Sequence, residues 1–131
     1  MPYVIGVVLA ASVCLFATVV GFDRDRAFYP TVTIVIASYY GLFAVMGGSA
    51  RALAAESIVA GGFVVISVVA FKANLWLLVA ALAGHGVFDF IHSGLIADPG
   101  VPAWWPSFCL AFDLVAAAYL AVLLLKARIR A

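Results

Sequence analysis

The 131-residue sequence has few charged residues. Asp, Glu, Lys and Arg make up 10% of it, whereas 68% of the residues are hydrophobic. A soluble globular domain carries charge on roughly a quarter of its residues and is about half apolar. This chain therefore has too little polar surface to coat a water-soluble globule. The shortage of charge excludes an ordinary soluble domain and predicts an integral membrane protein.

Cysteine and net charge are also scarce. The two cysteines are too few for a disulfide framework, and the formal net charge of +1 provides no basic excess for nucleic acid. Linkers, low-complexity runs and internal repeats are absent as well. We expect a single domain over residues 1–131, with no nucleic-acid partner.

Long apolar runs are what the sequence has instead. A membrane-spanning helix needs about 20 apolar residues, and five runs of such a length lie between charged or turn-forming breaks. Pro30 and Pro106 stand where we expect the first residue of a helix, a position at which proline costs no internal hydrogen bond. The sequence predicts an all-α integral membrane bundle of five transmembrane helices, over residues 3–21, 30–48, 52–71, 75–96 and 106–125.

The basic residues indicate an orientation. If the five spans alternate, only Arg51 of the seven Lys and Arg residues lies on the side of the N-terminus. Cytoplasmic loops carry an excess of Lys and Arg. We therefore expect an external N-terminus and a cytoplasmic C-terminus in a plasma (inner) membrane. The six residues on the cytoplasmic side are Arg24, Arg26, Lys72, Lys126, Arg128 and Arg130.

Residues 83–94, AGHGVFDFIHSG, interrupt the apolar pattern of the fourth run. His85, Asp89 and His92 are spaced i, i+4 and i+7, which places them within roughly 60° of one helix face. They extend over about 10 Å of the helix at 1.5 Å per residue. Because ionisable groups facing lipid cost several kcal/mol each, we expect this stripe to face the bundle interior.

Other runs contribute polar residues at a similar depth. Glu56 in the third run and Asp113 in the fifth fall in the outer half of the membrane, together with Asp89 and His92. No Lys or Arg is embedded with these carboxylates and imidazoles. A positive species is therefore needed, and either protons or a divalent cation can provide it.

Three further residues are candidates for the same site. Cys109 precedes Asp113 by four residues and so shares its helix face. Tyr39 and Tyr40 lie near the middle of the second run and can offer a phenol. The alternative for all three is ordinary packing in a helix bundle.

Zinc is the cation that these residue types favour. A neutral imidazole and a carboxylate together satisfy a borderline cation, so the predicted metal ligands are His85, His92, Asp89 and Asp113. A purely structural alternative is that the same groups only form hydrogen bonds between helices.

The segments HGVFDFIH and PAWWPSFCLAFDLVAAAYL resemble a pattern found in small bacterial multi-pass membrane proteins. That pattern is H-G-x-x-D-x-x-H followed by C-x-x-x-D, and the resemblance covers about residues 84–120. It implies no activity, since those proteins have none established. It does imply that one unit contains His85, Asp89, His92, Cys109 and Asp113.

Two classes of function fit these features. The class that the sequence favours is an intramembrane enzyme, either a metal-assisted hydrolase or a lipid- or isoprenoid-modifying enzyme. Asp89, Asp113 or Glu56 would be its catalytic carboxylate, and a lipid-like or other apolar small molecule would enter from the outer leaflet. The second class is a carrier or channel component that binds protons or cations. Five spans are few for a complete transport path, so a carrier would need an oligomer.

Overall fold

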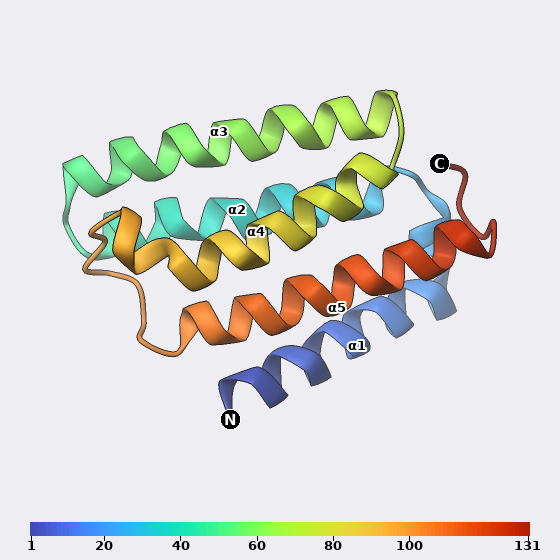
Figure 1. The fold of residues 1–131 in the computed structure, drawn as a ribbon, viewed down its shortest axis with the longest axis horizontal. Coiled ribbons are helices and arrows are strands. Elements are labelled where there is room, and N and C mark those ends of the chain that lie inside the picture. The colour runs from blue at the N-terminus through green and yellow to red at the C-terminus, as the bar shows by residue number, and fades with distance from the viewer.

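The computed structural model describes residues 1–131 and contains helices but no strands. Five of its helices are long and apolar enough to cross a membrane, which confirms the predicted all-α class and helix count. Figure 1 shows consecutive helices running in opposite directions along the bundle. The elements are α1 (Pro2–Val20), η1 (Phe22–Arg24), α2 (Phe28–Met46), α3 (Ala50–Lys72), α4 (Trp76–Leu95) and α5 (Trp105–Leu125).

The helix bounds differ from the predicted ones by at most two residues. α2 begins at Phe28 and α5 at Trp105, so Pro30 is the third residue of its helix and Pro106 the second, and neither is the first. The prediction was wrong there because the first N–H groups of any helix lack an internal acceptor, so proline is accepted throughout the first turn. α3 begins at Ala50 because the Ser49 side chain caps it, accepting a hydrogen bond from Ala52 N at 3.1 Å.

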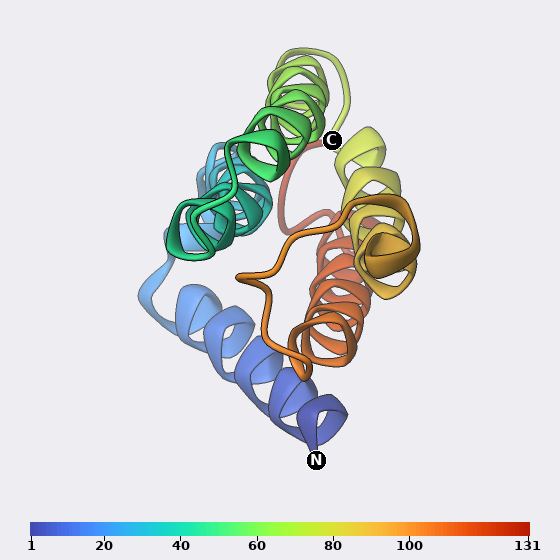
Figure 2. The same cartoon turned by 90° about the vertical axis from the view of Figure 1, so that its left-hand side faces the viewer.

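The helices pack in a definite order. α5 packs between α1 and α4, while α3 packs against both α2 and α4. Figure 2 views the bundle from the end that holds the N-terminus, where the α4–α5 connection (residues 96–104) crosses inward from α4 before it returns to α5. This connection covers part of that end of the bundle.

The two ends of the bundle differ in charge. The N-terminus, the α2–α3 turn and the α4–α5 connection share one end, called the N-terminal end below; η1, the α3–α4 turn and the C-terminus share the other (Figure 1). Arg51 is the one Lys or Arg residue at the N-terminal end. The remaining six are at the opposite, C-terminal end.

Gly100 fixes the α4–α5 connection to the end of α2. A Cβ atom at this position would lie 1.8 Å from the carbonyl oxygen of Phe43, which no side chain allows. Gly47 also has no room for a side chain, since its Cβ would lie 2.6 Å from Gly100 N. Glycine is required because only a residue without Cβ permits this approach of two backbones.

The buried interior is divided between apolar and polar regions. A large apolar cluster, which includes Leu78 and Leu82, joins residues of all five long helices. A smaller one, called the aromatic cluster below, lies closer to the N-terminal end. It consists of Tyr40, Phe43, Trp105 and Cys109. The buried ionisable side chains of α3, α4 and α5 lie beside it.

Candidate cation-binding site

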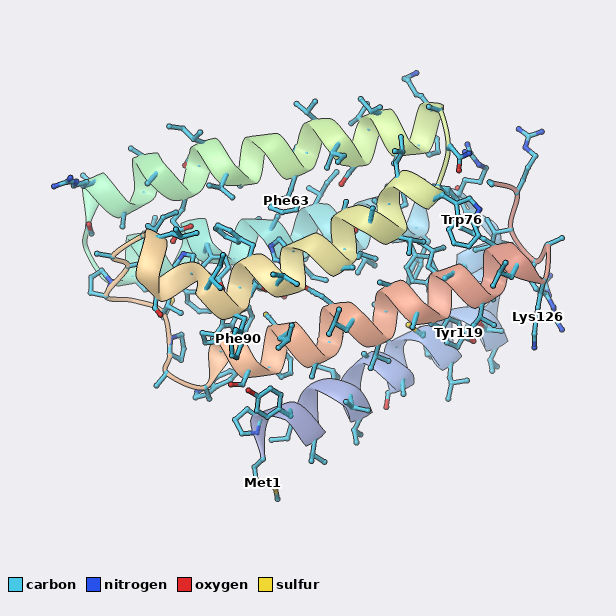
Figure 3. All side chains as sticks on the ribbon, viewed as in Figure 1. Met1, Phe63, Trp76, Phe90, Tyr119 and Lys126 are labelled. Carbon is cyan, nitrogen blue, oxygen red and sulfur yellow. The ribbon has the colours of Figure 1, made fainter.

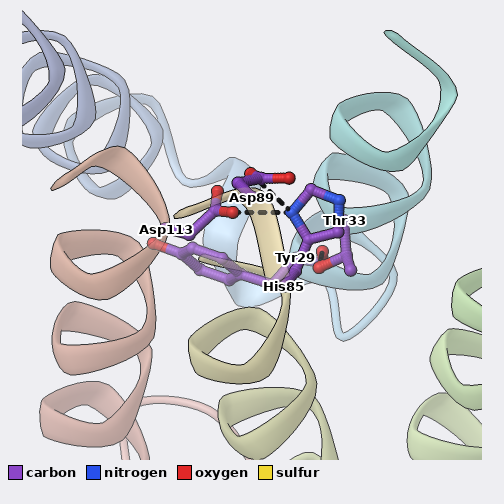
Figure 4. Close-up of polar contacts among 5 residues, drawn as sticks. All are labelled: Tyr29, Thr33, His85, Asp89 and Asp113. Atoms are coloured by element: carbon purple, nitrogen blue, oxygen red, sulfur yellow. Dashed lines mark hydrogen bonds and ion pairs between the residues drawn. The ribbon is translucent and has the colours of Figure 1, made fainter. Parts of the chain in front are cut away.

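A core trio of His85, Asp89 and Asp113 lies between α4 and α5. Nδ1 of His85 is 2.7 Å from Oδ2 of Asp113 and 3.2 Å from Oδ2 of Asp89. Figure 4 shows both carboxylates directed at this ring nitrogen. All three residues are at most 1% exposed. This part of the polar stripe therefore faces the bundle interior, where desolvated charges can be paired.

Gly86 lets α4 and α5 approach each other at the level of the trio. A Cβ at this position would lie 3.1 Å from Cβ of Asp113 and 3.4 Å from the carbonyl oxygen of Leu110. Gly84, by contrast, has open space around it. Small residues at a helix contact allow close backbone packing, so Gly86 sets the separation across which His85 reaches Asp113.

His92, about two turns further along α4, binds a different carboxylate. Its Nε2 is 2.5 Å from Oε1 of Glu56 on α3, and both side chains are buried. Tyr40 of α2 stacks on the His92 ring, with centroids 4.0 Å apart and an interplanar angle of 18°. The structure thus brings three of the four predicted metal ligands together and pairs the fourth, His92, with Glu56.

The remaining predicted residues lie at different distances from the trio. Cys109 is buried in the aromatic cluster and neighbours Asp89, and the Tyr40 hydroxyl has Asp89 as its polar neighbour. Tyr39 is 38% exposed and packs edge-on against Trp105, with ring centroids 5.3 Å apart. Tyr39 therefore does not join the buried polar groups.

Sequence reasoning missed Phe63 of α3. Its ring meets the His85 ring edge-on, with centroids 4.6 Å apart and an interplanar angle of 81°, and Figure 3 shows it directed from α3 toward α4. Phe88 contacts both the His85 and His92 rings. A phenylalanine in an apolar helix carries no sequence signal for such a role, since its orientation depends on packing.

Several buried oxygen atoms in this region make no hydrogen bond. A buried acceptor without a partner costs about 1–3 kcal/mol. Three carboxylates and two imidazoles are buried here, and no Lys or Arg is buried with them, so the region has excess negative charge. The unpartnered atoms include Oη of Tyr40, Oε2 of Glu56, Oδ1 of Asp89 and Oδ1 of Asp113.

The core trio has the composition of a metal site. Its three ligand atoms lie within 4.8 Å of one another. Zinc bonds of about 2.0–2.2 Å place two ligand atoms of a tetrahedral site about 3.3–3.6 Å apart. The contact of 3.2 Å between His85 and Asp89 is already close to this spacing, whereas the contact of 2.7 Å between His85 and Asp113 is that of a hydrogen bond. Binding zinc therefore requires the His85 and Asp113 ligand atoms to move apart by about 0.6 Å or more.

A cavity of about 1160 Å³, called the vestibule below, opens at the N-terminal end. It lies between the start of α3, the end of α4 and the α4–α5 connection, and it reaches His92. Arg51 and Asp98 also line it, whereas no member of the core trio does. Asp98 was not among the predicted site residues; the signal that could have found it is a carboxylate that follows His92 closely, just past the end of the helix.

A second cavity is an apolar groove of about 560 Å³ between α1, α2 and α5. Phe43, Trp105 and Cys109 line this groove, whereas Tyr40 packs against them and stacks on His92. The aromatic cluster therefore lies between the groove and the polar groups.

No family model, curated protein or solved structure that was compared with this chain matches it. The functional conclusion consequently depends on the chemistry and geometry of the side chains.

Proposed function

We propose that this protein binds a small cation in the core of its helix bundle and is a carrier or a channel component. The observation that supports this most directly is the core trio, whose three ligand atoms lie within 4.8 Å of one another. Neither the vestibule nor the apolar groove borders the trio. The trio therefore has ligands for an ion, but neither large cavity offers it space for an organic substrate.

Zinc is the first cation that we propose. His85 would supply a nitrogen ligand and Asp89 and Asp113 an oxygen ligand each, which leaves a fourth position for water or for the next ligand in a transfer. Protons are the alternative. A protonated His85 would donate to Asp113, and a further proton on Asp89 would balance the second carboxylate.

Polar groups that continue toward the C-terminal end support a carrier. Thr18 bonds the buried Asp23 carboxylate and lies 2.7 Å from the Tyr119 hydroxyl. Tyr29, a neighbour of Cys14, adds another buried hydroxyl. An ion or proton that leaves a central site needs polar groups along its route, and these residues provide them on the side opposite to the vestibule.

We place the N-terminal end of the bundle outside and the C-terminal end in the cytoplasm of a plasma (inner) membrane. Six of the seven Lys and Arg residues lie at the C-terminal end, as the positive-inside rule requires. The vestibule then opens to the outside. Because five helices are few for a transport path, we propose that several copies assemble.

A metal-assisted hydrolase is the second candidate, and the vestibule favours it. The vestibule reaches His92, and the hydrogen bond from His92 to Glu56 is of the kind that prepares a general base. A lipid-like substrate would bind there beside Arg51. The core trio that would hold the metal does not line the vestibule, which is why we rank this candidate second.

Zinc binding by the purified protein in detergent tests the proposed ion. We expect stoichiometric zinc by elemental analysis, a lower thermal unfolding midpoint after a strong chelator is added, and loss of the trio's ion in Asp113→Ala. Asp25→Asn is the matched control, because Asp25 is exposed and only caps Ala27 N. A wild type that contains no metal and whose unfolding midpoint does not change with the chelator would exclude zinc and favour protons as the bound ion.

Reconstitution into liposomes separates the carrier from the hydrolase. Vesicles that contain the wild type should equilibrate zinc or protons with an internal reporter faster than vesicles that contain Asp113→Ala. Equal rates for both proteins and for empty vesicles, with each ion in turn, would contradict the carrier and favour the enzyme.

A further inference from the structure

A second set of ligand groups lies around His92. Glu56 bonds His92 through Oε1 at 2.5 Å, and the carboxylate of Asp98 is a further neighbour of Glu56. Each histidine of α4 is therefore accompanied by two carboxylates. His92, Glu56 and Asp98 are called the vestibule trio below.

The vestibule trio contains buried oxygen atoms that no protein donor reaches. Glu56 is 1% exposed and its Oε2 has no hydrogen-bond partner, and Oδ2 of Asp98 is also buried without one. The other oxygens are occupied, since Oε1 of Glu56 contacts His92 and Oδ1 of Asp98 accepts from Gly100 N at 3.1 Å. Two neighbouring carboxylates repel each other unless a positive species neutralises them.

The fold holds Asp98 in place. Asp98 belongs to the α4–α5 connection, which packs so closely against α2 that a Cβ at Gly100 would lie 1.8 Å from the Phe43 carbonyl oxygen. The hydrogen bond from Gly100 N then orients the Asp98 side chain. The Asp98 carboxylate is consequently held in a fixed position in the vestibule wall, which His92 also lines.

We propose that His92, Glu56 and Asp98 form a second cation site beside the vestibule, whose wall includes His92 and Asp98, and that this site takes a hydrated divalent cation from outside water. Only the core trio brings three ligand atoms within 4.8 Å of one another, so the vestibule trio is the more open of the two. An open set of oxygen-rich ligands suits a cation that keeps some of its water.

The core trio and the vestibule trio are two separate binding sites and not one binuclear centre. His85 and His92 are seven residues apart, about 10 Å along a helix, whereas the ions of a two-metal centre lie roughly 3.5–4 Å apart. Tyr40 joins the two levels, because its ring stacks on His92 and its hydroxyl neighbours Asp89. The vestibule trio thus loads the cation that the core trio then receives. This loading role rests on the proposed carrier function, whereas binding of a cation at the vestibule trio does not depend on that function.

Counting bound zinc by calorimetry tests the second site. The wild type should bind two ions per chain, and Glu56→Gln, Asp98→Asn and Asp113→Ala should each bind one. The double variant Glu56→Gln/Asp113→Ala should bind none. The amide variants remove the carboxylate but keep a carbonyl oxygen. The Asn side chain at position 98 can still accept from Gly100 N, and the Gln side chain at position 56 can still contact His92. Asp25→Asn, remote from both trios, should bind two.

The possible results distinguish the two proposals. A wild type with one ion that Asp98→Asn and Glu56→Gln leave in place would overturn the second site. Loss of both ions in Asp98→Asn, at an unchanged unfolding midpoint, would also overturn the second site, because the two ions would then belong to one shared site. A wild type without zinc overturns both metal sites. Loss of one ion in Asp98→Asn with none lost in Asp113→Ala supports the vestibule trio and overturns the core trio. If Glu56→Gln does not fold, Asp98→Asn decides, because residue 98 lies outside the helices.

Discussion

His85 of α4 and Asp113 of α5 are joined by a hydrogen bond of 2.7 Å in the fully buried interior of the bundle. Removing one partner leaves the other unpaired in a low dielectric, which costs on the order of 3 kcal/mol in buried ion pairs. We expect His85→Ala and Asp113→Ala to destabilise the protein individually, with a coupling energy of about 1–3 kcal/mol in a double-mutant cycle. Unfolding in mixed micelles measures it.

His92→Ala combined with Asp113→Ala is the control for that cycle. His92 bonds Glu56 and not Asp113, so these two losses should add within about 0.5 kcal/mol. Additive losses for His85 and Asp113 as well would mean that their contact contributes nothing of its own.

Gly86 and Gly84 provide a matched pair of substitutions on α4. Gly86→Val should push α4 away from α5, because even a Cβ there would lie 3.1 Å from Cβ of Asp113. Gly84→Val should be tolerated, since nothing lies within 4 Å of its Cβ position. The unfolding midpoint and the zinc content should fall in Gly86→Val only. Equal effects of the two variants would show that the close helix contact does not control the site.

Tyr40 holds the His92 ring by stacking, and its hydroxyl is buried without a hydrogen bond. Tyr40→Phe keeps the ring and removes the unpartnered hydroxyl, so the stability should stay the same or rise slightly. Tyr40→Leu removes the stacking surface and should lower both the unfolding midpoint and zinc binding at the vestibule trio. If Tyr40→Phe lost as much binding as Tyr40→Leu, the hydroxyl and not the stacking would be the important feature.

Arg26 ties three segments together at the C-terminal end. Its guanidinium donates to the carbonyl oxygens of Phe71, Arg130 and Ala131 at 2.7, 3.0 and 2.7 Å. Arg26→Ala should therefore release residues 126–131, which faster amide hydrogen exchange in that segment would reveal. Arg24→Ala is the control, because Arg24 is exposed. Unchanged exchange in Arg26→Ala would mean that other contacts hold the tail.

Reporter fusions at both termini test the membrane orientation. An odd number of spans with six of seven basic residues at the C-terminal end predicts an external N-terminus and a cytoplasmic C-terminus. Arg51→Ala should leave this orientation unchanged, since it increases the bias. Two reporters on the same side would contradict the five-span topology.

The number and type of the helices could be read from the sequence because membrane insertion depends on local properties. A run of about 20 apolar residues spans the hydrocarbon by itself, whatever its neighbours are. The positions of the helix ends were less accurate, as Pro30 shows, because several positions of a first turn accept proline equally well. The stripe of His85, Asp89 and His92 followed from the regular rotation of an α-helix, which is also a local property.

The choice of partners was decided by the tertiary structure. His85 and His92 lie on the same face of α4, yet one binds Asp113 and the other Glu56, because Asp113 of α5 lies level with His85 and Glu56 of α3 lies level with His92. Spacing within one helix contains no information about these levels, which depend on packing details such as the absent side chain of Gly86. The sequence by itself determined five apolar helices with a polar stripe. The tertiary structure placed Asp98 beside Glu56, because a loop position depends on where the chain returns and packs, here through Gly100 against Phe43.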